Sequence, residues 1–137
     1  NMTLADAFIS TWSLKYQANL LRPVTYIQRL INPRWQPYVE SPSFPEYPSG
    51  HSVVSAAAAD MLTSLYGAVA FTDHTHEDVA PPRSYTSFEA AATEAAFSRM
   101  YGGIHFRQAI ENGLRQGSCV TEHILDRVTM RQFGQNE

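Results

Sequence analysis

Residues 44–51 read Phe-Pro-Glu-Tyr-Pro-Ser-Gly-His, and an apolar run from Val53 to Leu65 follows them. Two prolines stiffen the approach, and Gly50 lets the backbone come close to a ligand. The pattern predicts a helix from Gly50 to about Tyr66, with Ser49 as its N-cap. Free amides and the positive end of the helix dipole would then face a bound phosphate-like group. Taken alone, the stretch fits a plain capped helix start and an oxyanion site equally well.

Helical spacing also dominates the rest of the chain. Apolar residues recur at three- and four-residue steps, whereas hardly any segment alternates as a strand would. Pro23 ends the first predicted helix, and Gly102 and Gly103 separate the last two. Thr86 to Glu89 fits a capping box for the helix that follows it. We therefore predict an all-α helical bundle, with helices at residues 3–21, 25–31, 50–66, 86–101 and 105–128.

Two loops interrupt this bundle. Five of the eight prolines fall within residues 32–49, which predicts a stiff and extended surface loop. Residues 67–85 are polar and hold two more prolines, which predicts a mobile loop. Its His-x-His sequence at 74–76 is able to bind a metal, but nothing fixes these side chains, so a solvated loop is the favoured interpretation. With no internal repeat, residues 1–137 are expected to form one helical domain.

The composition narrows the possible function classes. A net charge of -3 argues against a general nucleic-acid binder, so any anion site must be local. No apolar run is long enough to span a bilayer. The single cysteine, Cys119, excludes an internal disulfide. No signal peptide is visible, and these residues leave export and localisation open.

Cationic residues on both sides of residues 44–51 are candidates to share an anion site. Lys15 is the only lysine, and it stands seven residues before Arg22, about two helical turns away on nearly one face. Arg99 ends one predicted helix, and His105 begins the next one after a diglycine turn. The dipole at that helix start would disfavour protonated imidazole and leave a nitrogen lone pair available. Alone, the first pair fits solvated surface cations, and the second fits a capping turn with a satisfied histidine.

Together the three clusters read Lys-x6-Arg-Pro, Pro-Ser-Gly-His and Ser-Arg-x5-His. Their order and spacing resemble the superfamily of type 2 phosphatidic acid phosphatases and vanadium-dependent haloperoxidases. The resemblance implies a vanadium haloperoxidase-like fold, of which this chain would be the C-terminal core half. It also implies an acid-base role for His51, and an axial role for His105, which would bind vanadium or attack phosphorus. The implied ligands of a vanadate or phosphate oxyanion are Lys15, Arg22, Ser49, Gly50 and Arg99.

Two aromatic residues favour the haloperoxidase branch. Trp12 lies three residues before Lys15, and Phe44 lies seven before His51. Chloride-oxidising members of the family are similar in having a tryptophan and a phenylalanine at these places, where they line the halide pocket. The alternative is that both are core aromatics. The resemblance then implies vanadate as cofactor, with hydrogen peroxide, a halide and an organic acceptor as partners, and with Lys15 polarising the peroxide.

Two other functions stay open at this stage. The first is an acid phosphatase without a cofactor, which acts on a phosphate monoester through a phosphohistidine at His105, with His51 protonating the leaving group. The second is a helical module that binds an oxyanion without turnover. Neither function involves nucleic acid or a membrane span. The resemblance alone favours an extracytoplasmic location.

The sequence departs from the family pattern at two points. The family often has an aspartate four residues after the axial histidine, where this chain has Ala109, so His105 is expected to lack its orienting carboxylate. Glu111 is the nearest replacement, but it points elsewhere along a helix. Further helices usually precede the lysine motif, whereas only 14 residues precede Lys15. We expect a missing N-terminal segment or a partner subunit to cover apolar helix faces.

Overall fold

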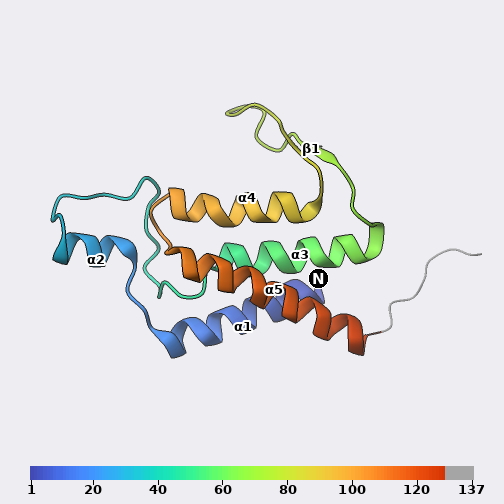
Figure 1. Cartoon of the computed structure of the whole chain (residues 1–137), viewed down its shortest axis with the longest axis horizontal. Coiled ribbons are helices and arrows are strands. Elements are labelled where there is room, and N and C mark those ends of the chain that lie inside the picture. The colour runs from blue at the N-terminus through green and yellow to red at the C-terminus, as the bar shows by residue number, and fades with distance from the viewer. Residues whose placement is uncertain (129–137) are drawn as a thin grey trace, which may run out of the picture.

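A computed structural model describes residues 1–128, which form a helical bundle built around one central helix (Figure 1). The central helix, α3, packs against α1, α4 and α5. The all-α prediction is confirmed, and a two-stranded hairpin is the exception within the described part of the chain. The elements are α1 (Met2–Ala18), α2 (Pro23–Leu30), α3 (Gly50–Tyr66), β1 (Phe71–Asp73), β2 (Arg83–Tyr85), α4 (Phe88–Tyr101) and α5 (Arg107–Arg127). The predicted single domain of residues 1–137 extends into residues 129–137, which lie outside the described part.

The ends of α3 follow from local residues that the sequence shows directly. Ser49 is the N-cap, and its Oγ accepts a hydrogen bond from the Ser52 N–H at 3.4 Å. Gly67 ends the helix with φ of 76°, a backbone conformation that residues other than glycine rarely adopt. The predicted bounds of 50–66 are therefore confirmed.

Other helix ends differ from the prediction by a few residues. α1 ends at Ala18 and not at residue 21, because Asn19 adopts a left-handed conformation with φ of 45°. α2 then starts directly at Pro23, whose fixed φ suits a first helical position. The N-cap of α4 is Ser87, whose Oγ accepts from the Ala90 N–H at 3.1 Å, so the capping box predicted at residues 86–89 is wrong by one position.

Glycines let α5 lie against α3 with almost no side chain between them. A Cβ at Gly117 would stand 2.3 Å from the Val53 carbonyl oxygen, and one at Gly113 would stand 2.9 Å from the Ser49 carbonyl oxygen. Both distances are far shorter than van der Waals contact. This close approach lets the Ser49 N–H donate to the Ala109 carbonyl at 3.0 Å. The start of α3 is thereby fixed against the first turn of α5.

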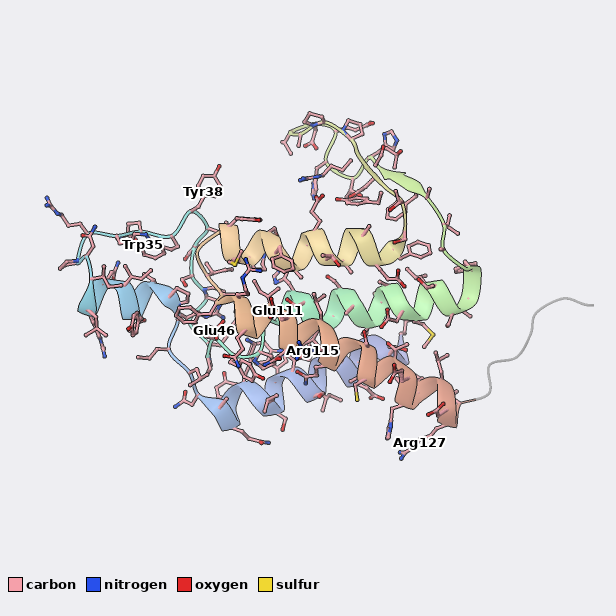
Figure 2. All side chains as sticks on the ribbon, in the orientation of Figure 1. Trp35, Tyr38, Glu46, Glu111, Arg115 and Arg127 are labelled. Atoms are coloured by element: carbon pink, nitrogen blue, oxygen red, sulfur yellow. The ribbon has the colours of Figure 1, made fainter. Side chains whose placement is uncertain are left out.

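The proline-rich loop, residues 32–49, is tied to the bundle at several points. The Val39 N–H donates to the Gly102 carbonyl at 3.0 Å, and the Glu46 N–H donates to the Leu20 carbonyl at 3.0 Å. A Cβ at Gly103 would lie only 3.0 Å from the Trp35 ring, so the loop packs closely on the turn before α5. Tyr38, by contrast, points away from the bundle (Figure 2).

Residues 67–85 contain strands that the sequence analysis did not predict. β1 and β2 pair antiparallel, with Phe71 opposite Tyr85. Arg83 and Tyr85 both contact the Glu94 carboxylate on α4, at 2.8 and 3.0 Å. In the loop between the strands, His74 contacts Glu77. Within residues 1–128, no group of three or more histidine, cysteine or acidic residues is placed to hold a metal ion.

Large apolar side chains remain exposed on α1, on α2 and on the turn between them. Phe8 and Ile9 are 54% and 65% exposed, and Leu30 is 68% exposed. An exposed apolar surface of this kind is typical of a contact face with another segment or protein. Among the described helices, none combines the length and the apolar character that crossing a membrane requires.

Candidate active site

All but two of the predicted site residues line one cavity of about 320 Å³. It lies where α1, the first turns of α3, the proline-rich loop and the segment before α5 come together. No acidic side chain is among the lining residues of this cavity in the described part of the chain. The lining comprises Phe8, Thr11, Trp12, Lys15, Arg22, Pro42, Phe44, Gly50, His51, Val54, Ser55, Ile104 and His105.

Two of the predicted oxyanion ligands lie just outside this lining. Ser49 is fully buried, and its hydroxyl accepts the capping bond from Ser52. Arg99 is half-buried in the last turn of α4, and its Nε donates to the Ser98 hydroxyl at 3.0 Å. The Arg99 charge nevertheless acts on His51, whose pKa it lowers. The structure thus brings together every predicted residue except these two, which stand beside the cavity.

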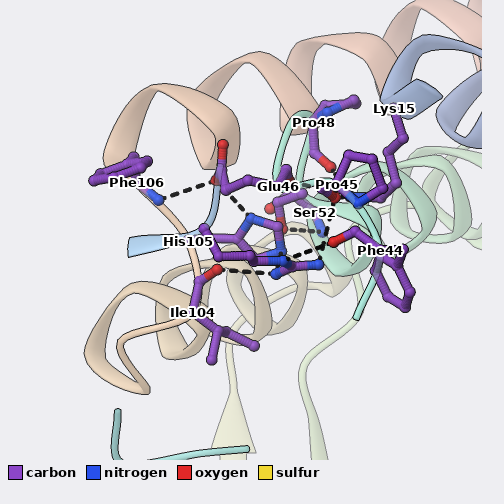
Figure 3. Close-up of polar contacts among 11 residues, drawn as sticks. Lys15, Phe44, Pro45, Glu46, Pro48, Ser52, Ile104, His105 and Phe106 are labelled. Atoms are coloured by element: carbon purple, nitrogen blue, oxygen red, sulfur yellow. Dashed lines mark hydrogen bonds and ion pairs between the residues drawn. The ribbon is translucent and has the colours of Figure 1, made fainter. Parts of the chain in front are cut away.

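Lys15 is buried, and its ammonium group is fully engaged with the proline-rich loop. Its Nζ donates to the carbonyls of Pro45 at 3.0 Å, Glu46 at 3.1 Å and Pro48 (Figure 3). An ammonium group has three N–H donors, so contact with an oxyanion would require one of these bonds to be given up. Its pKa is lowered from 10.5 to about 8, first by burial and then by the positive charge of Arg22, while Glu46 partly opposes the shift.

Arg22 is buried at the start of α2 and joins three segments of the chain. Its Nε donates to the Phe44 carbonyl at 3.0 Å, and one terminal nitrogen donates to the Ile104 carbonyl at 2.9 Å. The same terminal nitrogen lies 3.2 Å from the Nε2 of His105. The planar guanidinium group therefore connects the loop, the turn before α5 and the second histidine.

His105 is 5% exposed and lies between a carboxylate and a guanidinium group. Its Nδ1 is 2.7 Å from the Oε1 of Glu46, an oxygen that also accepts the Phe106 N–H at 3.1 Å (Figure 3). The prediction that His105 begins the last helix is wrong, because α5 begins at Arg107 with Phe106 as N-cap. The pKa of His105 is lowered chiefly by burial and secondarily by Arg22 and Lys15, whereas Glu46 raises it.

His51, in the first turn of α3, keeps access to solvent at the cavity. Its pKa lies below the ordinary value of 6.5, first because of partial burial and then because of the positive charges of Arg99 and Lys15. At neutral pH the ring is therefore uncharged and able to accept a proton.

Aromatic rings form one wall of the cavity. The rings of Trp12 and Phe44 meet edge to face with centroids 4.7 Å apart. Lys15 Nζ and Arg22 Cζ lie 5.2 and 4.9 Å from the centroid of the Phe44 ring. Both aromatics that the sequence analysis assigned to a halide pocket line the cavity, and the Phe44 ring adjoins both buried cations.

Glu46 is the residue that the sequence analysis missed. The expectation that His105 lacks an orienting carboxylate is wrong, because Glu46 supplies one from 59 residues earlier in the chain. Position 109 carries no acid, and the Glu111 side chain is instead half-exposed on α5, 3.7 Å from Arg107 (Figure 2). The sequence did contain a signal for Glu46, because this acid lies between Pro45 and Pro48 in the stretch that forms the site. A carboxylate that is buried there needs a polar partner.

The family comparison agrees with this geometry. Residues 30–133 match the model of the second helical-bundle domain of VCPO, the vanadium haloperoxidase family. A solved bacterial vanadium-dependent iodoperoxidase is 49% identical, with a TM-score of 0.90 over 93% of this chain and 32% of its own. No curated protein matches the chain.

Two more distant solved structures have the same fold. They are the holo and apo forms of a bacterial vanadium-dependent chloroperoxidase, both 17% identical to this chain, with TM-scores of 0.72 and 0.71. The aligned regions include 88% and 89% of this chain, and 33% and 34% of the chloroperoxidase chains. The chain therefore spans about a third of the length of these solved relatives. On its match to the domain model and to the iodoperoxidase, the chain belongs to the vanadium haloperoxidase family.

Proposed function

We propose that this chain forms the vanadate-binding part of a haloperoxidase that oxidises a halide with hydrogen peroxide. One observation carries the proposal: Lys15, Arg22, His51 and His105 line a single cavity. Because the chain belongs to the vanadium haloperoxidase family, we interpret this cluster of residues as a vanadate-binding site. The phosphatase and the inactive oxyanion-binding module remain the alternatives that an experiment has to separate.

The lining of the cavity fits a vanadate anion. It offers an ammonium group, a guanidinium group and the start of a helix, and it contains no carboxylate among the described residues. A Cβ at Gly50 would meet Lys15 and Thr11 only at 3.9 Å, so the glycine leaves room on the cavity side of the helix start. In the bound state, Lys15, Arg22, Ser49, Gly50 and Arg99 would hold the oxygens of the anion, and Nε2 of His105 would bind vanadium.

The proposed chemistry divides between the cofactor and the chain. Bound vanadate would supply Lewis-acid activation of peroxide without a change of oxidation state. His51 accepts a proton from the entering hydrogen peroxide, for which its lowered pKa keeps it uncharged at neutral pH. Lys15 and Arg22 provide fixed positive charge in a buried setting, where charge is worth more than in water.

We propose iodide as the first halide to test, because the 49% identical relative is an iodoperoxidase. Trp12 and Phe44 would form the halide side of the cavity, next to Lys15 and Arg22. Iodide is a large and polarisable anion, which suits a cavity lined by aromatic rings and by cationic groups. The organic acceptor of the oxidised halogen is not specified by these contacts.

We further propose that the exposed apolar face of α1 and α2 is covered in the working protein. The chain spans about a third of its solved relatives, and Phe8, Ile9 and Leu30 are all more than half exposed. A further segment of the protein or a partner subunit would bury them.

The proposed function is tested by assaying the intact protein in two ways. One assay measures iodide oxidation with peroxide and vanadate, and the other measures hydrolysis of a chromogenic phosphate ester. Vanadate should activate the first reaction, whereas it should inhibit a phosphatase. His105→Ala should abolish the vanadate-dependent rate while the helical circular dichroism is retained. An undiminished rate in that variant would refute the assignment, and oxyanion binding without turnover in either assay would favour the inactive module.

A further inference from the structure

The Glu46 carboxylate is buried among partners that all belong to the candidate site. Its side chain is 2% exposed, and that of His105 is 4% exposed. Oε1 lies 2.7 Å from His105 Nδ1 and accepts the Phe106 N–H at 3.1 Å. A carboxylate removed from water is strongly destabilising unless such bonds replace its hydration. The contact is therefore specific, and the rest of the fold holds it in place.

The partners of His105 determine which ring nitrogen carries the proton. A carboxylate only accepts hydrogen bonds, and a guanidinium group only donates them. Glu46 faces Nδ1, and Arg22 faces Nε2 at 3.2 Å. A neutral imidazole between these two groups must donate from Nδ1 and accept at Nε2. Only this tautomer presents a lone pair at Nε2, on the ring edge that faces Arg22.

The main chain of Glu46 is fixed as firmly as its side chain. Its N–H donates to the Leu20 carbonyl at 3.0 Å, and its carbonyl accepts from Lys15 Nζ at 3.1 Å. The neighbouring Pro45 carbonyl accepts from the same ammonium group at 3.0 Å. The carboxylate is thus aimed at His105 by contacts with the helix that carries Lys15 and with the turn that follows it.

We propose that Glu46 is the positioning residue for His105. It holds the Nδ1–H tautomer and would increase the electron donation of Nε2 to the central atom of a bound oxyanion. Position 109 is an alanine and offers no carboxylate for this task. This inference rests on the proposed function, since it assigns Nε2 of His105 as the atom that would bind vanadium. It predicts that Glu46 matters for a ligand that bonds to Nε2 and not for an anion that the cations merely surround.

The test compares vanadate with inorganic phosphate in three variants of the intact protein. Glu46→Gln keeps an oxygen acceptor for Phe106 but loses the charge, and Glu46→Leu loses both. Glu111→Gln is the matched control, because the Glu111 side chain is half-exposed and its ion pair is with Arg107, away from His105. We expect vanadate affinity to fall about 10-fold in Glu46→Gln and about 100-fold in Glu46→Leu. Phosphate affinity should be unchanged or slightly higher, since a negative charge near the anion is removed.

A second readout does not depend on vanadate. Nitrogen-15 NMR of labelled histidine should show a protonated Nδ1 and an unprotonated Nε2 for His105 in the wild-type protein. A protonated Nε2 would overturn the inference. An equal loss of vanadate and phosphate affinity in Glu46→Gln would overturn it too, because damage to the fold would weaken both. If the wild-type protein bound phosphate but no vanadate, the proposed function would fail, while the NMR result would still decide the role of Glu46.

Discussion

Replacing Gly117 with alanine should break the contact between α3 and α5 that fixes the site. The new Cβ would lie 2.3 Å from the Val53 carbonyl oxygen, 2.8 Å from the Ala56 Cβ and 2.9 Å from the Ala57 nitrogen. Two of these three atoms are helix backbone, which cannot move aside alone. Ordinary contact begins at 3.4 Å, so α5 has to shift by about 1 Å, which forfeits up to about half of each dispersion contact along the interface.

The magnitude follows from two opposing effects. Overpacking of a well-packed core destabilises by about 1 to 3 kcal/mol, and a clash with three atoms, two of them backbone, belongs at the upper end. Alanine in a helix recovers up to about 1 kcal/mol relative to glycine. We therefore expect Gly117→Ala to lower the free energy of unfolding by about 2 kcal/mol.

The matched control is the same substitution at Gly50, where a Cβ would meet Lys15 and Thr11 only at 3.9 Å. Urea denaturation followed by circular dichroism, run beside calorimetric titration with phosphate, separates the two variants. Gly50→Ala should unfold at the wild-type urea concentration or above it but bind phosphate more weakly, because the methyl group faces the cavity. A wild-type unfolding midpoint for Gly117→Ala would refute the reasoning about the helix contact.

Three further predictions concern the bonds that hold the site. Arg22→Lys should destabilise the protein by about 3 kcal/mol, as measured by differential scanning calorimetry. The reason is that one ammonium group cannot replace a guanidinium group that reaches the Phe44 and Ile104 carbonyls and His105. Thr121→Val should cost about 1 kcal/mol in urea denaturation, since the Thr121 hydroxyl donates to the Ala57 carbonyl at 3.0 Å in the core. The pKa of His51 is lowered from 6.5 in the folded protein, so on acidification the unfolded chain takes up a proton at His51 before the folded chain does. The free energy of unfolding should therefore fall as the pH drops from 6.5 through the folded-state pKa. In His51→Asn that loss should be smaller, and an identical pH profile would contradict the shift.

The sequence predicts helix positions well where a single residue decides the outcome. Ser49 caps α3 and the helix ends at Tyr66 as expected, since the Ser49 side chain and the Gly67 backbone each act locally. The end of α1 was misjudged because Asn19 adopts a left-handed conformation, which asparagine tolerates but does not require. The hairpin was missed because each strand has only three residues, too few to show an alternating pattern, and because no local pattern reveals the contact of β2 with Glu94 of α4.

The candidate site shows the same division. The motif spacing, together with the family resemblance that it carries, identified most of the side chains that gather at the cavity. It did not identify the partners of their polar atoms. Glu46 meets His105 across 59 residues, and what the imidazole needs is an acceptor near Nδ1, which any element of the fold is able to provide. An acid expected in the first turn of α5 is therefore replaced by one from a loop.

The motif residues also shape the loop that they were expected to serve. Lys15 binds three loop carbonyls, Arg22 binds the Phe44 carbonyl, and the Ser49 N–H binds the Ala109 carbonyl. Removing the Lys15 or Arg22 side chain takes away structural bonds as well as a candidate ligand, so lost activity in such a variant does not by itself demonstrate contact with the oxyanion. The role in stabilising the fold and the role in binding the oxyanion are distinguished only when binding and unfolding are measured on the same variant. Gly50→Ala meets this condition, because it leaves each of these bonds in place and changes only the surface that faces the cavity.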